Sequence, residues 1–76
     1  MLYKTIALEL LESRPTLYRH LRLSRRLLSE MERYASDLRS LHLRQQDAGM
    51  DSHEAMEHAV HEIEVRIAQE AARLET

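Results

Sequence analysis

Apolar residues recur at helical spacing through most of the chain and divide it into three segments. Between Thr16 and Gln46, leucines return every three or four positions, with no Gly or Pro and few β-branched residues. This pattern predicts one long helix over about residues 16–46, roughly 45 Å long at ~1.5 Å per residue.

A shorter helix is expected before it, over about residues 2–12. Its apolar positions keep helical spacing and cover more than half of the circumference. A helix of this length is marginal alone in water, so it must be buried against something. Ser13 and Pro15 then predict a turn, with Ser13 as an N-cap and Pro15 in the first turn of the next helix.

One apolar row along the long helix follows the 4-3 spacing of a coiled coil. The row comprises Leu17, Leu21, Ser24, Leu28, Met31, Ala35, Leu38 and His42. Leu27, Tyr34 and Leu41 lie beside this row and widen the apolar face, so that it can contact two other helices. His42 is interpreted as a satisfied, half-exposed histidine, or alternatively as a contact that sets register or senses pH.

The start of the last helix is the best-marked boundary. Residues 47–50 form a predicted turn in which Gly49 takes a left-handed C-cap, and Asp51 starts a capping box with Glu54. The helix then covers about residues 51–75. Its predicted inner face comprises Met56, Ala59, Val60, Ile63, Ile67, Ala71 and Leu74. Because the connection is short, the two longer helices are expected to form an antiparallel hairpin.

These segments predict an all-α, coiled-coil-like, three-helix domain over residues 1–76. With 76 residues and no Trp, Phe or Cys, its core is close to the smallest that folds alone. We therefore expect oligomerisation or a protein partner to complete the fold. The surplus apolar surface assigned to this contact comprises Leu2, Ile6, Leu10, Leu27, Tyr34 and Leu41.

The net charge of −2 conceals an asymmetry along the chain. Residues 1–46 carry nine Lys/Arg and five Asp/Glu, whereas residues 47–76 carry two Arg and eight Asp/Glu. Such a division indicates either two partners of opposite charge or two halves that fold onto each other. We favour the second interpretation, in which the acidic last helix offsets the arginines of the long helix.

An arginine stripe on the polar side of the long helix suggests an alternative function. The stripe comprises Arg19, Arg22, Arg26, Arg33 and Arg44. Positive charge at this spacing is suited to nucleic-acid phosphates or to an anionic membrane surface. Acidic residues interleave with the stripe, however, and no lysine cluster or aromatic stacking platform accompanies it. Nucleic-acid binding is therefore the alternative rather than the favoured hypothesis.

The last helix also carries a weak candidate for a metal site. Glu54, His58 and His61 share one face at i, i+4 and i+7, but neither an HExxH nor an ExxH motif is present. We expect a polar outer surface that binds no metal or other cofactor. Val65, Ala68 and Ala72 continue this face as a weak apolar stripe, which is either ordinary helix surface or a subunit contact.

No pattern in the chain indicates catalysis. It lacks a Cys nucleophile and a Gly-rich phosphate loop, so we expect no enzyme. It also lacks an apolar run of the ~20 residues needed for a membrane span, and Met1–Leu11 does not resemble an export signal. The expectation is a cytoplasmic, non-catalytic interaction module: an adaptor, regulator or assembly subunit.

Overall fold

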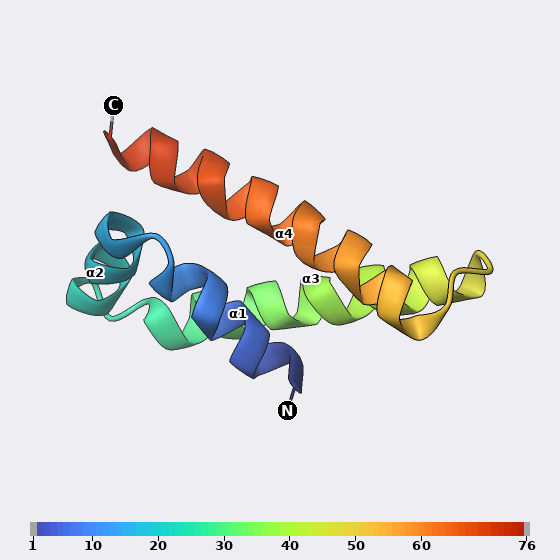
Figure 1. Cartoon of the computed structure of the whole chain (residues 1–76). Helices are drawn as coiled ribbons and strands as arrows, with labels where there is room; N and C mark the ends of the chain where they lie inside the picture. The colour runs from blue at the N-terminus through green and yellow to red at the C-terminus, as the bar shows by residue number, and fades with distance from the viewer. Residues whose placement is uncertain (1, 76) are drawn as a thin grey trace.

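A computed structural model describes residues 2–75, and every regular element within them is a helix. The helices are α1 (Leu2–Glu12), α2 (Pro15–Leu23), α3 (Leu27–Asp47) and α4 (Ser52–Glu75). The all-α prediction is confirmed. Figure 1 shows α4 turning back from the end of α3 and diverging from it, with α1 and α2 gathered towards the wider end.

The continuous helix predicted over residues 16–46 is wrong, because the chain breaks between α2 and α3. Arg25 takes the left-handed conformation, with φ of 61°. Its N–H donates to the Arg22 carbonyl at 3.1 Å, and the Arg26 N–H donates to the Leu21 carbonyl at 2.8 Å. This pair of bonds is the Schellman motif, which closes a helix and lets the next one leave in a new direction.

The same motif ends α3 at the position where the sequence predicted it. Gly49 has φ of 105°, and its N–H donates to the Gln46 carbonyl at 3.0 Å. The Met50 N–H donates to the Gln45 carbonyl at 3.1 Å. Both turns thus use one hydrogen-bonding scheme, with glycine at the left-handed position of one and arginine at that of the other.

Of the two predicted N-caps, the structure contains one and lacks the other. Asp51 caps α4, since its Oδ1 accepts the Glu54 N–H at 2.9 Å. Ser13 does not cap α2, because its hydroxyl donates backwards to the Leu10 carbonyl at 2.6 Å and Arg14 occupies the cap position. Pro15 is the first residue of α2, as predicted.

The break also removes the predicted coiled-coil row. After the change of direction at Arg25, Leu28 points outward and is 64% exposed, and Ser24 is exposed as well. The residues that α3 buries all lie in its central and C-terminal turns. They are Tyr34, Ala35, Leu38 and His42.

Residues four apart form the buried row of α4, and this spacing explains why the helix diverges from α3. The row comprises Ala55, Ala59, Ile63, Ile67 and Ala71. Each step of four residues advances by about 40° around the helix, so the buried row winds across the surface. Ridges of this type favour crossing angles of about 50° rather than the about 20° of a coiled coil. The sequence analysis identified this inner face correctly, except that it missed Ala55 and included Leu74, which is 37% exposed.

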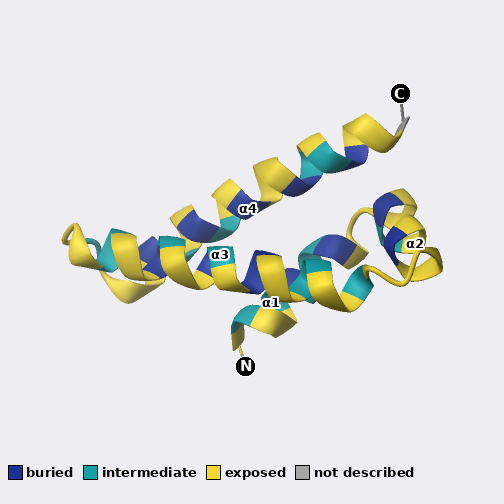
Figure 2. Cartoon of the chain, turned by 180° about the vertical axis from the view of Figure 1, so that it is seen from behind, coloured by how far each residue is buried: buried dark blue, intermediate teal, exposed yellow. Residues whose placement is uncertain are grey.

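All four helices contribute to one core, seen as the dark blue segments of Figure 2. Its largest fully buried side chains are Leu11 from α1, Leu17 from α2, Leu38 from α3, and Ile63 and Ile67 from α4. Because α2 turns away from α3, Leu17 can join this core near the later turns of α4. Replacing any of these residues with alanine should cost about 2–5 kcal/mol.

His42 joins three helices through its ring. The Tyr3 hydroxyl lies 2.9 Å from Nδ1, and the Ser52 carbonyl lies 3.0 Å from Nε2. A carbonyl can only accept, so Nε2 carries the proton and Nδ1 accepts from Tyr3. The histidine is satisfied, as interpreted from the sequence, but it is buried rather than half-exposed, at 7%.

We predict that Arg25→Gly stabilises the protein by about 0.5 kcal/mol, because glycine adopts the left-handed conformation without steric cost. The free energy of unfolding in urea measures the effect. Arg26→Gly is the matched control, since it removes the same charge at an ordinary φ of −109°. A larger loss of stability in Arg25→Gly than in the control would contradict the prediction.

We also predict that Tyr3→Phe destabilises the protein by about 1 kcal/mol, since it leaves Nδ1 of buried His42 without a donor. Thermal unfolding at neutral pH measures the loss. Tyr18→Phe serves as the control because no hydrogen bond joins the Tyr18 hydroxyl to the described residues. Equal effects of the two substitutions would show that the Tyr3 hydroxyl contributes nothing.

Candidate interaction surface

Packing of α1 against α3 covers much of the apolar surface that the sequence assigned to a partner. Four of the six assigned residues are half-buried and pack against the core. These are Ile6, Leu10, Leu27 and Leu41. Tyr34 is only 3% exposed and offers almost no surface to a partner, whereas Leu2 is 62% exposed. Helix α1 thus covers the broad apolar face of α3 that the sequence assigned to a partner.

A different exposed surface lies at the end of α2 and the turn into α3. We call it the basic end and define it by Arg19, Arg22, Leu23, Arg25, Arg26 and Leu28. Leu23 is 75% exposed and Leu28 is 64% exposed, the two highest values among the large apolar residues that the structure describes. No Asp or Glu occurs from residue 13 to residue 29, a span that holds five arginines.

Local structure explains why these side chains face outward. Leu17 and Leu21 are buried and fix the inner face of α2. The next residues therefore project away from the core, and the left-handed Arg25 carries the chain around the tip. The Arg22 guanidinium lies 6.0 Å from the centre of the Tyr18 ring, at the edge of cation–π distance.

The predicted arginine stripe is not continuous, because the break divides it between two helices. Arg19 and Arg22 lie on α2, Arg26 lies in the turn, and Arg33 and Arg44 lie on α3. None of the first three forms an ion pair with a described carboxylate. Nucleic-acid phosphates would therefore meet two separate groups of arginines rather than one stripe.

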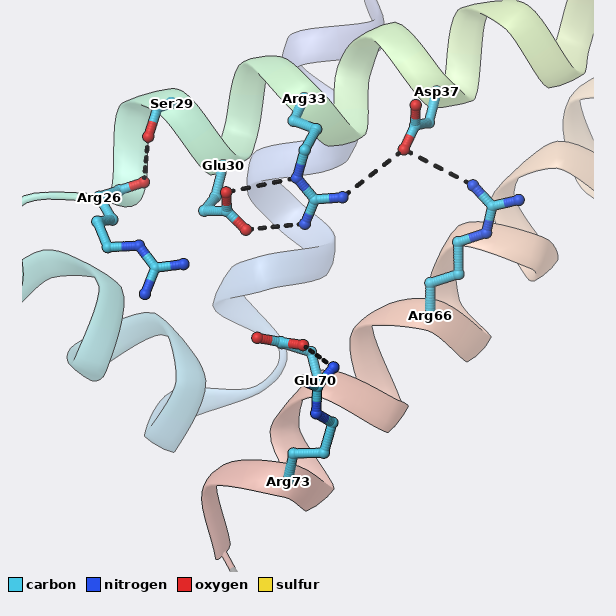
Figure 3. A network of polar contacts seen from close by, with 8 residues as sticks. All are labelled: Arg26, Ser29, Glu30, Arg33, Asp37, Arg66, Glu70 and Arg73. Carbon is cyan, nitrogen blue, oxygen red and sulfur yellow. Dashed lines mark hydrogen bonds and ion pairs between the residues drawn. The ribbon is translucent and has the colours of Figure 1, made fainter.

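Arg33 is held within the fold by its neighbours on α3, as Figure 3 shows. Its guanidinium donates to both Glu30 carboxylate oxygens, at 2.8 and 3.4 Å, and lies 3.9 Å from Asp37. It also lies over the Tyr34 ring at 4.4 Å. These contacts leave Arg33 poorly placed to bind an external anion.

The charges of the two halves do not offset each other in the way the sequence suggested. In the described part of the chain, a single ion pair joins α3 to α4, between Arg66 and Asp37 at 3.6 Å. Its arginine belongs to the acidic helix and its carboxylate to the basic one (Figure 3). The basic end therefore retains its positive charge after folding.

Two side chains beside Arg33 have shifted pKa values, for different reasons. Hydrogen bonding from Arg33 is the main cause that lowers the pKa of Glu30, with further help from the positive charges of Arg33 and Arg26. Burial raises the pKa of Tyr34. Both shifts favour the protonation states present at neutral pH, with an ionised Glu30 and a neutral Tyr34.

The outer face of α4 carries the residues considered for a metal. Glu54, His58 and His61 are all exposed, and the two histidines line a shallow hollow with Glu57. Within residues 2–75, no three His, Asp or Glu side chains are arranged to hold a metal ion. Val65 lies on the same face and is 38% exposed.

A groove of about 330 Å³ lies between α1 and α3. Its lining residues are Tyr3, Lys4, Glu32, Ala35, Ser36 and Arg39. Every buried side-chain N or O atom among the described residues has a hydrogen-bond partner, so the groove contains no such atom that awaits a ligand. Its charges are mixed and give no clear preference for an anion or a cation.

No helix within the described residues is both long enough and apolar enough to cross a membrane.

Comparison of the chain with family models, curated proteins and solved structures yields no match. The functional inference therefore depends on the surfaces themselves.

We predict that Glu30→Gln lowers stability by less than about 1 kcal/mol at pH 7, since the Arg33 side chain of the broken pair is half exposed and screened by solvent. A lowered pKa in the folded state means that ionised Glu30 stabilises the fold above its unfolded pKa. This contribution is lost as the pH falls through the folded pKa. The difference between wild type and variant should therefore shrink as the pH falls below the ordinary range of a glutamate pKa, as measured by urea unfolding across pH. A difference that stays constant with pH would show that the charge of Glu30 is irrelevant.

Proposed function

We propose that this protein is a non-catalytic helical interaction module that binds a protein partner through the basic end. The observation that carries the proposal is the exposure of Leu23 and Leu28 beside arginines that form no ion pair with a described carboxylate. Burying one leucine side chain contributes about 1.5–3 kcal/mol. Two such leucines thus supply most of the contact energy of a modest interface.

The arginines of the basic end add orientation and specificity. Guanidinium groups form bidentate hydrogen bonds with carboxylates. A cluster of positive charges also speeds the association with a negatively charged surface. The favoured partner is therefore an acidic protein surface with a small apolar centre. An adaptor or assembly subunit fits this description, and so does self-association.

The alternative of nucleic-acid association is supported by Arg19, Arg22 and Arg26, which form no ion pairs with the described carboxylates. It is weakened by the net charge of −2 and by the absence of lysine from this region. Replacing the three arginines with glutamine should flatten the salt dependence of duplex binding if this alternative holds. No binding of a labelled duplex at low salt would exclude it.

We predict that Leu23→Ser combined with Leu28→Ser abolishes partner binding and changes the free energy of unfolding by less than about 0.5 kcal/mol. Affinity capture with quantitative mass spectrometry, together with native mass of the purified chain, measures binding to other proteins and to itself. Leu43→Ser is the control, because Leu43 is 41% exposed on α3, outside the basic end.

Partners retained by wild type and the control but lost by the double variant would support the proposal. Identical capture profiles for all three proteins, with the same native mass, would overturn it. Equal unfolding free energies exclude misfolding as the cause of a loss.

A further inference from the structure

The charges of this molecule are separated along its length. Residues 45–65 hold six Asp/Glu and no Lys or Arg, which is the converse of residues 13–29. This acidic segment includes the turn after α3 and the first half of α4, whereas α2 lies at the opposite end (Figure 1). The molecule extends 40 Å along its longest axis, several times the about 8 Å Debye length at physiological salt. The two ends therefore act as independent charged surfaces.

The acidic segment also has an apolar centre. Glu54, Glu57 and Glu64 are exposed and lie within about 100° of Val65, at 100° per residue. Val65 is 38% exposed, and the small residues Ala68 and Ala72 continue its face towards the C-terminus. This outer face of α4 is a row of carboxylates beside a narrow apolar stripe, complementary to the basic end in charge and in pattern.

We infer that the basic end binds the outer face of α4 on a second copy of this chain. This inference rests on the proposed function and names the partner of the same surface. Leu23 and Leu28 meet the stripe that begins at Val65, while the arginines face the carboxylates. Because each copy has one basic end and one outer face of α4, two copies can form both contacts at once.

Charge complementarity is the reason for choosing a second copy. Each chain carries the basic surface and its acidic counterpart, and no ion pair among the described residues joins the two. The ion pairs formed by α4 are within the helix or reach α3, and none reaches the basic end among the described residues. Attraction between opposite ends exceeds the weak repulsion of two molecules that each carry a net charge of −2, because contacting groups lie well within one Debye length.

The test uses two charge-reversed variants of the full chain. Variant A is Arg22→Glu with Arg26→Glu, and variant B is Glu57→Arg with Glu64→Arg. All four residues are exposed and outside the core. In A the basic end loses its net positive charge, and in B the outer face of α4 loses its net negative charge, so neither A on A nor B on B keeps the attraction. A on B keeps the unchanged pair of surfaces at one contact and places the two introduced glutamates opposite the two introduced arginines at the other.

Sedimentation velocity and native mass are measured for wild type, A, B and an equimolar mixture, at about 50 and about 500 mM NaCl. Wild type should associate at about 100 µM in low salt and at least about tenfold more weakly in high salt. A and B should each be monomeric, and the mixture should form an A–B species. Circular dichroism checks that every variant is helical.

A control variant, Glu32→Arg with Arg39→Glu, exchanges charges on α3 outside both surfaces and should associate like wild type. Monomeric wild type at low salt, or no association in the mixture, would overturn the self-contact. If the chain is monomeric but still captures another protein in a manner that needs Leu23 and Leu28, only this inference fails. If capture is also independent of the two leucines, the proposed function fails with it.

Discussion

At Arg25 the backbone takes a φ of 61°, two hydrogen bonds close the last turn of α2, and α3 leaves in a new direction. The arrangement of the other helices depends on this single change of direction. It allows Leu17 and Leu21 to reach the core near the far end of α4, where a straight helix would carry them away from it. It also exposes Leu23 and Leu28 at the tip. The packing of the core and the exposure of the candidate interaction surface thus both follow from the turn at Arg25.

Alanines at the start of α4 set the distance between α3 and α4 beside the turn that joins them. Ala55 and Ala59 are fully buried and let α4 approach α3 closely beside the turn. Ile63 and Ile67 then occupy the region where the helices separate and α1 and α2 enter. The change from Ala55 and Ala59 to Ile63 and Ile67 matches the divergence seen in Figures 1 and 2, and Ala71 ends the row near α2. His42 fixes the narrow end by bonding to residues of α1 and α4.

The sequence predicted the helical class, the turn at Gly49, the Asp51 cap and most of the inner face of α4, because each has a local signal. It failed at Arg25, where an arginine adopts a conformation that glycine usually marks. Because the break was not predicted, the apolar row was also predicted wrongly, since Leu28 faces solvent once the helix is broken. It also misplaced the partner surface, because periodicity shows that a face is broad but not that α1 will cover it. The exposed pair at the tip had only one signal: five arginines without an intervening carboxylate.

The two hydrogen bonds of His42 close chain segments of very different length. The contact with Ser52 spans 10 residues and the contact with Tyr3 spans 39. Loop-closure entropy makes the longer closure more costly by about 1.2 kcal/mol. During folding we therefore expect α3 and α4 to associate first through their short turn, and α1 to dock afterwards on a surface already formed. The helix that comes first in the chain is thus expected to dock only after the later pair has formed.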